Sequence, residues 1–155
     1  MKKNILKSII SLGALVALSF TPALLAAPDE GPLVGFWDSQ VTLTDCNGHT
    51  VASFEAYEMF HDGGTLSSTD NTPPGGHGPG FGTWTRVGYR RFSAPFQFFN
   101  FNPDGSFAGV QKIMRTITLG THAAHYTSMV SFESYDPNGN LLFSGCGTET
   151  ATRLP

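Results

Sequence analysis

Glu58 is the residue whose type and position point most directly to chemistry. It lies in residues 52–60, ASFEAYEMF, where apolar and polar side chains alternate. In a strand this alternation places Glu58 on the same face as Phe54, Ala56 and Phe60, the face that we assign to the interior. A carboxylate in an apolar cavity has a raised pKa unless it is paired. Glu58 is therefore a candidate general acid or base, or a group that orients a ligand. The alternatives are a buried ion pair and a position near the mouth of a cavity, where water reaches it.

Three arginines are candidate partners for this carboxylate: Arg86, Arg91 and Arg115. By alternation, Arg86 shares a face with Trp84, and Arg115 shares a face with Ile113. An arginine inside a barrel commonly meets a ligand carboxylate. The sequence leaves both inward and outward placement open for each of the three.

Nucleophilic and metal chemistry have little support in the sequence. There is no Gly-x-Ser-x-Gly elbow and no cysteine–histidine pairing. The five histidines are scattered, and His122 and His125 point to opposite sides of a strand. A zinc site needs three or four converging ligands. We therefore expect no metal and no cofactor; His61 with Asp62 or with His77 is the best pairing if a site exists.

A glycine-rich stretch, GGHGPGFGTW, covers residues 75–84. It lacks the GxxxxGK[ST] and GxGxxG patterns, and a phosphate cradle would need a helix to begin after it. A strand is expected there instead. Residues 71–80 are thus predicted to form the longest loop, which is either a structural connection or a lid over one mouth of a barrel.

Turn signals recur at regular intervals and divide the chain into strands. They are CNGH (46–49), HDGG (61–64), NTPPGGHGPG (71–80), VGYR (87–90), NPDGS (102–106), LGTH (119–122) and DPNGN (136–140). Asn-Gly and Asp-Gly favour tight hairpins because both tolerate positive φ. The eight segments between these seven turns are rich in Phe, Thr, Val, Tyr and Ile, and none has a helical period.

The predicted fold is all-β, an eight-stranded antiparallel up-and-down β-barrel, with a two-sheet sandwich as the alternative. Closing the sheet removes its exposed edges. Cys46 ends the first segment and Cys146 lies early in the last, so closure brings the two sulfurs together. We therefore predict a Cys46–Cys146 disulfide, which is typical of an exported protein. An eight-stranded barrel is just wide enough to hold one small ligand.

Residues 1–26 have the pattern of a secretory signal peptide. A basic start with Lys2, Lys3 and Lys7 precedes an apolar stretch, which ends at Ala26 and Ala27. The remaining residues, 27–155, are predicted to form one domain in the periplasm or outside the cell, without a membrane anchor once the signal is cleaved. A retained anchor is the alternative. The net charge of −3 and the lack of a basic cluster argue against nucleic acid as a partner.

The GFW sequence at residues 35–37 resembles the Gly-x-Trp motif of lipocalins and the wider calycin group. The segments GTWTRVGYRRF (82–92) and NPDGSFAG (102–109) are similar to those of small secreted bacterial proteins of lipocalin-like type. The resemblance implies that Trp37 closes one end of the barrel and that Arg153 packs across it. It also implies that the barrel binds a small apolar molecule.

The expected function is binding of a small hydrophobic molecule in the barrel, without catalysis. The residues expected to line the site are Phe54, Glu58, Trp84, Arg86, Phe96, Arg115, Tyr126 and Phe132. One alternative is a barrel enzyme that isomerises or cyclises a polyene or polyketide-like substrate. Several polar groups converging in an apolar pocket would favour that alternative. Another is an interaction module that uses exposed Phe99 and Phe101. The sequence does not determine the ligand or the oligomeric state.

Overall fold

The computed structural model describes residues 31–72 and 76–155, and those ranges contain strands and no helix. The strands are β1 (Gly35–Thr44), β2 (Thr50–Phe60), β3 (Thr65–Asp70), β4 (Gly80–Thr83), β5 (Thr85–Gly88), β6 (Arg91–Ser93), β7 (Phe96–Phe101), β8 (Phe107–Leu119), β9 (His125–Tyr135) and β10 (Leu141–Arg153). The predicted signal peptide lies outside the described residues. Within the described ranges, no helix has the length and hydropathy needed to cross a bilayer.

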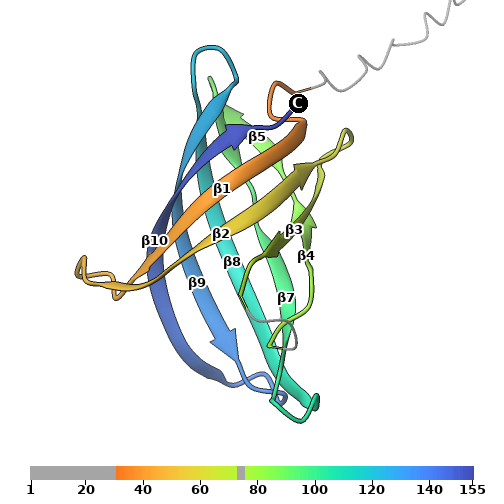
Figure 1. Ribbon diagram of the computed structural model, residues 1–155, viewed down its shortest axis with the longest axis vertical. Coiled ribbons are helices and arrows are strands. Elements are labelled where there is room, and N and C mark those ends of the chain that lie inside the picture. The colour runs from red at the N-terminus through yellow and green to blue at the C-terminus, as the bar shows by residue number, and fades with distance from the viewer. Residues whose placement is uncertain (1–30, 73–75) are drawn as a thin grey trace, which may run out of the picture.

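All the strands belong to one antiparallel sheet that closes on itself (Figure 1). The order is β5-β6-β8-β7-β4-β3-β2-β1-β10-β9, and pairing of β8 with β9 completes the ring. Two of the eight predicted segments are each split into two strands, β4 with β5 and β6 with β7. The first split falls at Trp84 and the second at Ala94 and Pro95. Pro95 has no backbone N–H to donate to a ladder, which accounts for the second break. The predicted eight-stranded up-and-down barrel is confirmed.

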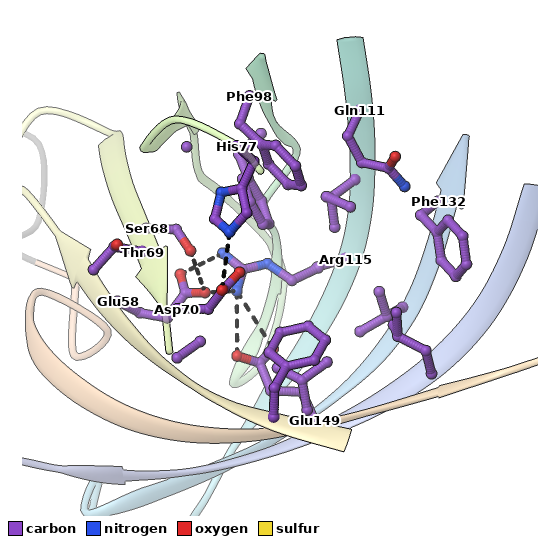
Figure 2. Close-up of a pocket in the computed structure, with 18 of the residues that line it drawn as sticks. Glu58, Ser68, Thr69, Asp70, His77, Phe98, Gln111, Arg115, Phe132 and Glu149 are labelled. Carbon is purple, nitrogen blue, oxygen red and sulfur yellow. Dashed lines mark hydrogen bonds and ion pairs between the residues drawn. The ribbon is translucent and has the colours of Figure 1, made fainter. Parts of the chain in front are cut away.

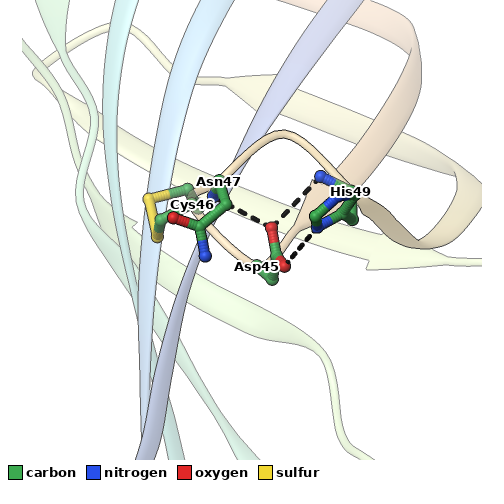
Figure 3. Close-up of a disulfide and its surroundings, with 5 residues drawn as sticks. Asp45, Cys46, Asn47 and His49 are labelled. Atoms are coloured by element: carbon green, nitrogen blue, oxygen red, sulfur yellow. Dashed lines mark hydrogen bonds and ion pairs between the residues drawn. A yellow bond between two sulfur atoms is a disulfide. The ribbon is translucent and has the colours of Figure 1, made fainter.

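The seam of the barrel is the pairing of the first and last strands. The β1–β10 ladder runs from Trp37 opposite Arg153 to Thr44 opposite Cys146. Just beyond it, Cys46 and Cys146 form the predicted disulfide, with their Cα atoms 4.9 Å apart (Figure 3). The Asp45 carboxylate holds the hairpin tip by accepting hydrogen bonds from the backbone N–H groups of Asn47 and His49.

One end of the barrel is closed by a packed apolar core. Its fully buried side chains are Leu33, Trp37, Phe60, Leu66, Phe92, Ile117, Leu119 and Tyr126. The Arg153 guanidinium lies 4.3 Å from the centre of the Trp37 ring, and Trp37 Nε1 donates to the Leu33 carbonyl at 3.0 Å. Arg153 also donates to the carbonyls of Val34 and Ala123, so this one side chain ties the first and last segments together.

Gly35 makes this closure possible. Its φ of +137° is a conformation that L side chains rarely adopt, and a Cβ at this position would lie 2.3 Å from Arg153 Nη1. The glycine of the Gly-x-Trp sequence therefore leaves room for the arginine above Trp37. The packing of Arg153 across Trp37, which the lipocalin resemblance implied, is present.

Toward the other end the interior is less densely filled. Ile113, Val130 and Phe132 form a second buried cluster, against which Leu43, Phe96 and Phe98 pack. On the outer face, Phe99 is 57% exposed and its ring meets that of Phe107 edge-on. Phe101, which we expected to be exposed, is half-buried after the irregularity in the β7–β8 ladder at Asn100 and Phe101.

Candidate ligand site

A layer of buried polar side chains crosses the barrel between its closed core and its less filled end. Alternation along the strands turns these side chains inward. The layer consists of Ser39 (β1), Glu58 (β2), Ser68 (β3), Arg115 (β8), Tyr126 (β9) and Glu149 (β10), all of which are buried. Buried polar groups are stable only when their hydrogen bonds are satisfied. Within the described residues, no buried side-chain nitrogen or oxygen lacks a partner.

Arg115 is the centre of the polar layer (Figure 2). Its Nη1 lies 2.7 Å from Oε1 of Glu58, and its Nη2 donates to Oε2 of the same carboxylate at 2.8 Å. Nη1 also donates to both carboxylate oxygens of Glu149, at 3.3 and 3.4 Å. Nε donates to the Ala94 carbonyl, and the guanidinium stacks 4.6 Å from the centre of the Phe96 ring. Arg115 therefore contacts both carboxylates, and its Nη1 is shared between them.

Hydroxyl groups complete the network. Ser68 donates to Glu58 Oε1 at 3.1 Å, and the Tyr126 hydroxyl donates to Glu149 Oε1 at 2.7 Å. Because Tyr126 has only one hydroxyl proton, Ser39 is the donor in the 3.0 Å bond between its Oγ and the Tyr126 oxygen. The chain of bonds thus extends from the closed core to the carboxylates.

The charges of the layer do not balance. With both carboxylates ionised, Glu58 and Glu149 outweigh the single guanidinium. Burial raises the pKa of Glu58 to about 7 from its ordinary 4.5; Arg115 opposes this shift and Glu149 adds to it. Burial would lower the pKa of Arg115, but Glu58 and Glu149 outweigh it and hold that pKa above its ordinary value. Burial, and then Glu149, raise the pKa of Tyr126. Arg115 and Tyr126 therefore keep their protons at neutral pH, and Glu58 titrates.

The polar layer forms part of the wall of a cavity of about 90 Å³. The apolar part of the wall comes from Val41, Leu43, Phe54, Ala56, Phe96, Phe98, Ile113, Val130 and Phe132. Its polar side chains are Glu58, Ser68, Thr69, Asp70, His77, Gln111, Arg115 and Glu149. An apolar hollow with a few convergent polar groups is the usual form of a small-molecule site.

Two glycines allow the aromatic walls to lie where they do. Gly145 is paired with Phe132 across the β9–β10 ladder, and a Cβ on Gly145 would lie 2.3 Å from the Phe132 ring. A Cβ on Gly80 would lie 2.7 Å from the Phe96 ring, so this glycine leaves similar room for Phe96. Each ring thus occupies the space that a neighbouring side chain would otherwise fill.

His77 lines the cavity from the glycine-rich segment. Its ring nitrogen Nε2 lies 3.0 Å from Asp70 Oδ1 and 2.7 Å from the Thr72 hydroxyl, and Nδ1 donates to the Gly78 carbonyl. His77 also forms an isolated backbone bridge to Asn100 of β7. The described part of this loop is therefore attached to the barrel wall; residues 73–75 lie outside the described residues.

No family model matches the chain, and no curated protein matches its sequence. No group of three or more His, Cys, Asp or Glu side chains within 31–72 and 76–155 is arranged to hold a metal ion. His61, considered above with His77, instead hydrogen-bonds Ser67.

Five of the eight residues expected at the site line the cavity: Phe54, Glu58, Phe96, Arg115 and Phe132. Tyr126 packs in the closed core and reaches the polar layer only through its hydroxyl. Trp84 packs at the closed end, where its Nε1 donates to the His61 carbonyl. Arg86 is exposed, as are all four residues of β5. The structure does not bring Trp84 or Arg86 to the cavity, because the chain breaks at Trp84 and the β5 hairpin lies at the closed end (Figure 1).

Six polar residues of the cavity were not predicted to line it: Ser68, Thr69, Asp70, His77, Gln111 and Glu149. Glu149 shares the inward face of β10 with Gly145, Gly147 and Ala151. None of these three residues is large enough to mark an interior face in the sequence. The inward set of β10 is recognisable only by counting from Cys146, whose disulfide fixes the register with β1.

Proposed function

We propose that this protein binds a small molecule with an apolar body in the cavity of the barrel. The observation that carries the proposal is the cavity itself, a hollow of about 90 Å³ with aromatic and aliphatic walls on a buried polar layer. Had the interior been packed throughout, as it is at the Trp37 end, binding in the barrel would have had no support.

The size of the cavity bears on the size of the ligand. Pockets for drug-sized ligands measure roughly 300–1,000 Å³, and a buried cavity of about 150 Å³ holds benzene. The hollow of about 90 Å³ suits a smaller molecule, or one end of a longer molecule that extends past Phe98 and Gln111.

Three features support a lipocalin-like protein in an oxidising compartment. The barrel is closed and up-and-down, Arg153 packs on Trp37 of the Gly-x-Trp sequence, and Cys46 is bonded to Cys146. Disulfides persist in the periplasm and outside the cell. We therefore place the binding function there, with residues 1–26 acting as the export signal.

Native mass spectrometry of the protein purified from its own host tests the proposal. We expect a mass excess over the disulfide-bonded chain that disappears on denaturation and corresponds to a small organic molecule. A control variant, Ile113→Trp, fills the cavity and should purify without the extra mass. Wild-type protein with no extra mass, and with no ligand-induced thermal shift across a library of small amphiphiles, would contradict the proposal.

A second candidate is catalysis of an isomerisation or cyclisation of a polyene or polyketide-like substrate. The specific observation in its favour is that Glu58, Arg115 and Glu149 converge in an otherwise largely apolar cavity. Glu58 would take a proton from one substrate atom and return it to another, so that no oxidant or reductant is consumed. Turnover of such a substrate that is lost in Glu58→Gln, with binding retained, would establish this function. Binding without turnover would favour the first candidate, binding of a small molecule without catalysis.

A further inference from the structure

The charged groups of the cavity are predominantly acidic. Three carboxylates line it, those of Glu58, Asp70 and Glu149, and the only guanidinium among its lining residues is that of Arg115. With the carboxylates ionised, the wall carries three negative charges against the single positive charge of Arg115. A cavity with low-dielectric walls strengthens the effect of such an imbalance on a ligand.

Arg115 is not free to receive an anionic ligand. Glu58 occupies one edge of its guanidinium through Nη1 and Nη2, Glu149 accepts from Nη1, and the Ala94 carbonyl accepts from Nε. A ligand carboxylate would have to displace one of these partners and would also lie beside the other carboxylates. The wall therefore disfavours fatty acids and other anions, although it contains an inward arginine.

Glu149 has the larger remaining capacity to accept a hydrogen bond. Glu58 receives three short bonds, two from Arg115 and one from Ser68, at 2.7–3.1 Å. Glu149 receives one short bond, from Tyr126 to Oε1, and its Oε2 has only the 3.4 Å contact with Arg115 Nη1. A donor on the ligand would complete the coordination of Oε2.

We infer that the ligand of this cavity is a small organic cation, an amine protonated at neutral pH and carried on an apolar body. This inference rests on the proposed binding function and names its ligand class. The ammonium group lies toward Glu149 and Glu58, and the apolar body lies against the phenylalanine rings. Aromatic faces also attract cations, and Phe96 already stacks on a guanidinium in this structure.

Cation binding is linked to the protonation of the polar layer. The titratable or charged groups that face Glu58 are Arg115 from β8, Glu149 from β10 and Tyr126 from β9, with Asp70 and His77 farther along the same cavity. Glu58 has a pKa of about 7, and a bound cation favours its ionised form. Affinity for the cation should therefore rise as the pH increases from about 6 to 8.

A matched series of probes tests the inference on wild-type, disulfide-bonded protein. n-Butylamine, n-butanol and butyrate have nearly the same size and differ in charge. Each is titrated at constant ionic strength into isotopically labelled protein, and binding is followed by NMR shifts of the amides that line the cavity. We expect butylammonium to bind about tenfold more tightly than butanol, butyrate to bind most weakly, and the amine preference to increase with pH.

The outcomes separate this inference from the binding proposal. Equal binding of the three probes, or a preference for butanol or butyrate, overturns the cationic ligand and leaves small-molecule binding in place. If no probe shifts the cavity amides, both fail for this cavity. Glu149→Gln, which keeps the shape and removes one of the three negative charges, should reduce the amine preference; Glu133→Gln, on the exposed face of β9, should leave it unchanged. A full amine preference in Glu149→Gln would overturn the inference, and if that variant does not fold, the wild-type series decides.

Discussion

The Arg115 guanidinium meets the Glu58 carboxylate along one edge, with Nη1 2.7 Å from Oε1 and Nη2 2.8 Å from Oε2, inside the barrel. β8 and β2, which carry the two residues, are not neighbours in the sheet, so the pair spans the interior. Both side chains are only about 2% exposed. Desolvation of the two charges opposes the gain from their attraction, and the pair is stable because both partners are present.

Loss of Arg115 should be strongly destabilising. Arg115→Met leaves Glu58 and Glu149 buried without a cation, and removing one partner of a buried pair typically costs about 3–5 kcal/mol. We expect a loss of that size in the free energy of unfolding measured with urea. Arg91→Met, at an exposed position of β6, is the control and should change the stability by less than about 0.5 kcal/mol. The triple variant Glu58→Gln, Arg115→Met, Glu149→Gln should recover part of the loss; no recovery would argue against unpaired charge as the cause.

The stability of the protein should depend on pH through Glu58. Its pKa is about 7 in the folded protein and 4.5 when unperturbed, so the folded state binds a proton more tightly. The stabilisation from that proton is fully present below pH 4.5 and is lost as the pH rises through 7; its upper limit is roughly 3 kcal/mol. Urea titrations from pH 4.5 to 8 should show wild type losing stability relative to Glu58→Gln over this interval. Parallel curves for the two proteins would show that Glu58 does not titrate there.

The contribution of Arg153 to the closed end of the barrel should depend on the shape of its guanidinium group as well as on its positive charge. The side chain stacks on Trp37 and donates to the carbonyls of Val34, just before β1, and Ala123, in the turn between β8 and β9, a geometry that a lysine ammonium cannot reproduce. We expect Arg153→Lys to lower the free energy of unfolding by about 1–2 kcal/mol. Gly35→Ala should lower the free energy of unfolding by at least this amount, because the added methyl group would displace Arg153. Wild-type stability in both variants would contradict the role assigned to this closure.

Removal of the disulfide should lower the free energy of unfolding without changing the fold. Cys46 and Cys146 are separated by 100 positions in the sequence, and a cross-link over that distance contributes roughly 2–5 kcal/mol. The Cys46→Ser, Cys146→Ser double variant should lose this amount in urea denaturation while keeping the far-ultraviolet spectrum of a β-protein. Reduced wild type should match the variant; a large difference between them would indicate that the serines themselves disturb the hairpin.

His77 should hold the described part of the glycine-rich loop against β7. Its ring bonds to Asp70, Thr72 and the Gly78 carbonyl, and next to it the amides of Gly78 and Phe101 donate across to backbone carbonyls. In His77→Ala, we expect hydrogen exchange at these two amides to accelerate about tenfold, as loss of a hydrogen bond of this kind would give. His61→Ala, in an exposed turn, serves as the control. Unchanged exchange in His77→Ala would show that the backbone bridge alone fixes the segment.

The fold was predictable because its determinants are local. Asn-Gly and Asp-Gly turns mark the hairpins, alternation marks the faces, and the two cysteines specify which strands meet at the seam. Within the site, alternation alone identified Glu58 as an inward carboxylate. It could not choose among Arg86, Arg91 and Arg115 as the partner, because the position of β8 relative to β2 is set by every ladder between them.

The misplaced residues have separate physical causes. Trp84 and Arg86 were expected at the cavity because residues 81–86, between the predicted turns at 71–80 and 87–90, were expected to form one continuous strand, whereas the chain breaks at Trp84. Glu149 was missed because its inward neighbours on β10 are glycine and alanine. The acidic balance of the cavity depends on Asp70 and Glu149 together, and neither was predicted to line it.

The disulfide also determines how the protein responds to mechanical tension. Its bond joins Cys46 to Cys146, so a pulling force applied to the two ends of the chain passes through the sulfur bridge and bypasses everything between. Only residues up to 45 and after 146 can be extracted. Because Trp37 and Arg153 face each other at the terminal end of the antiparallel β1–β10 ladder, tension opens this seam from that end and also breaks the pairing of β1 with β2 and of β10 with β9. An unfoldase or secretion motor acting from either end would meet a closed loop of about 100 residues, which it cannot extend into a single strand until the disulfide is reduced.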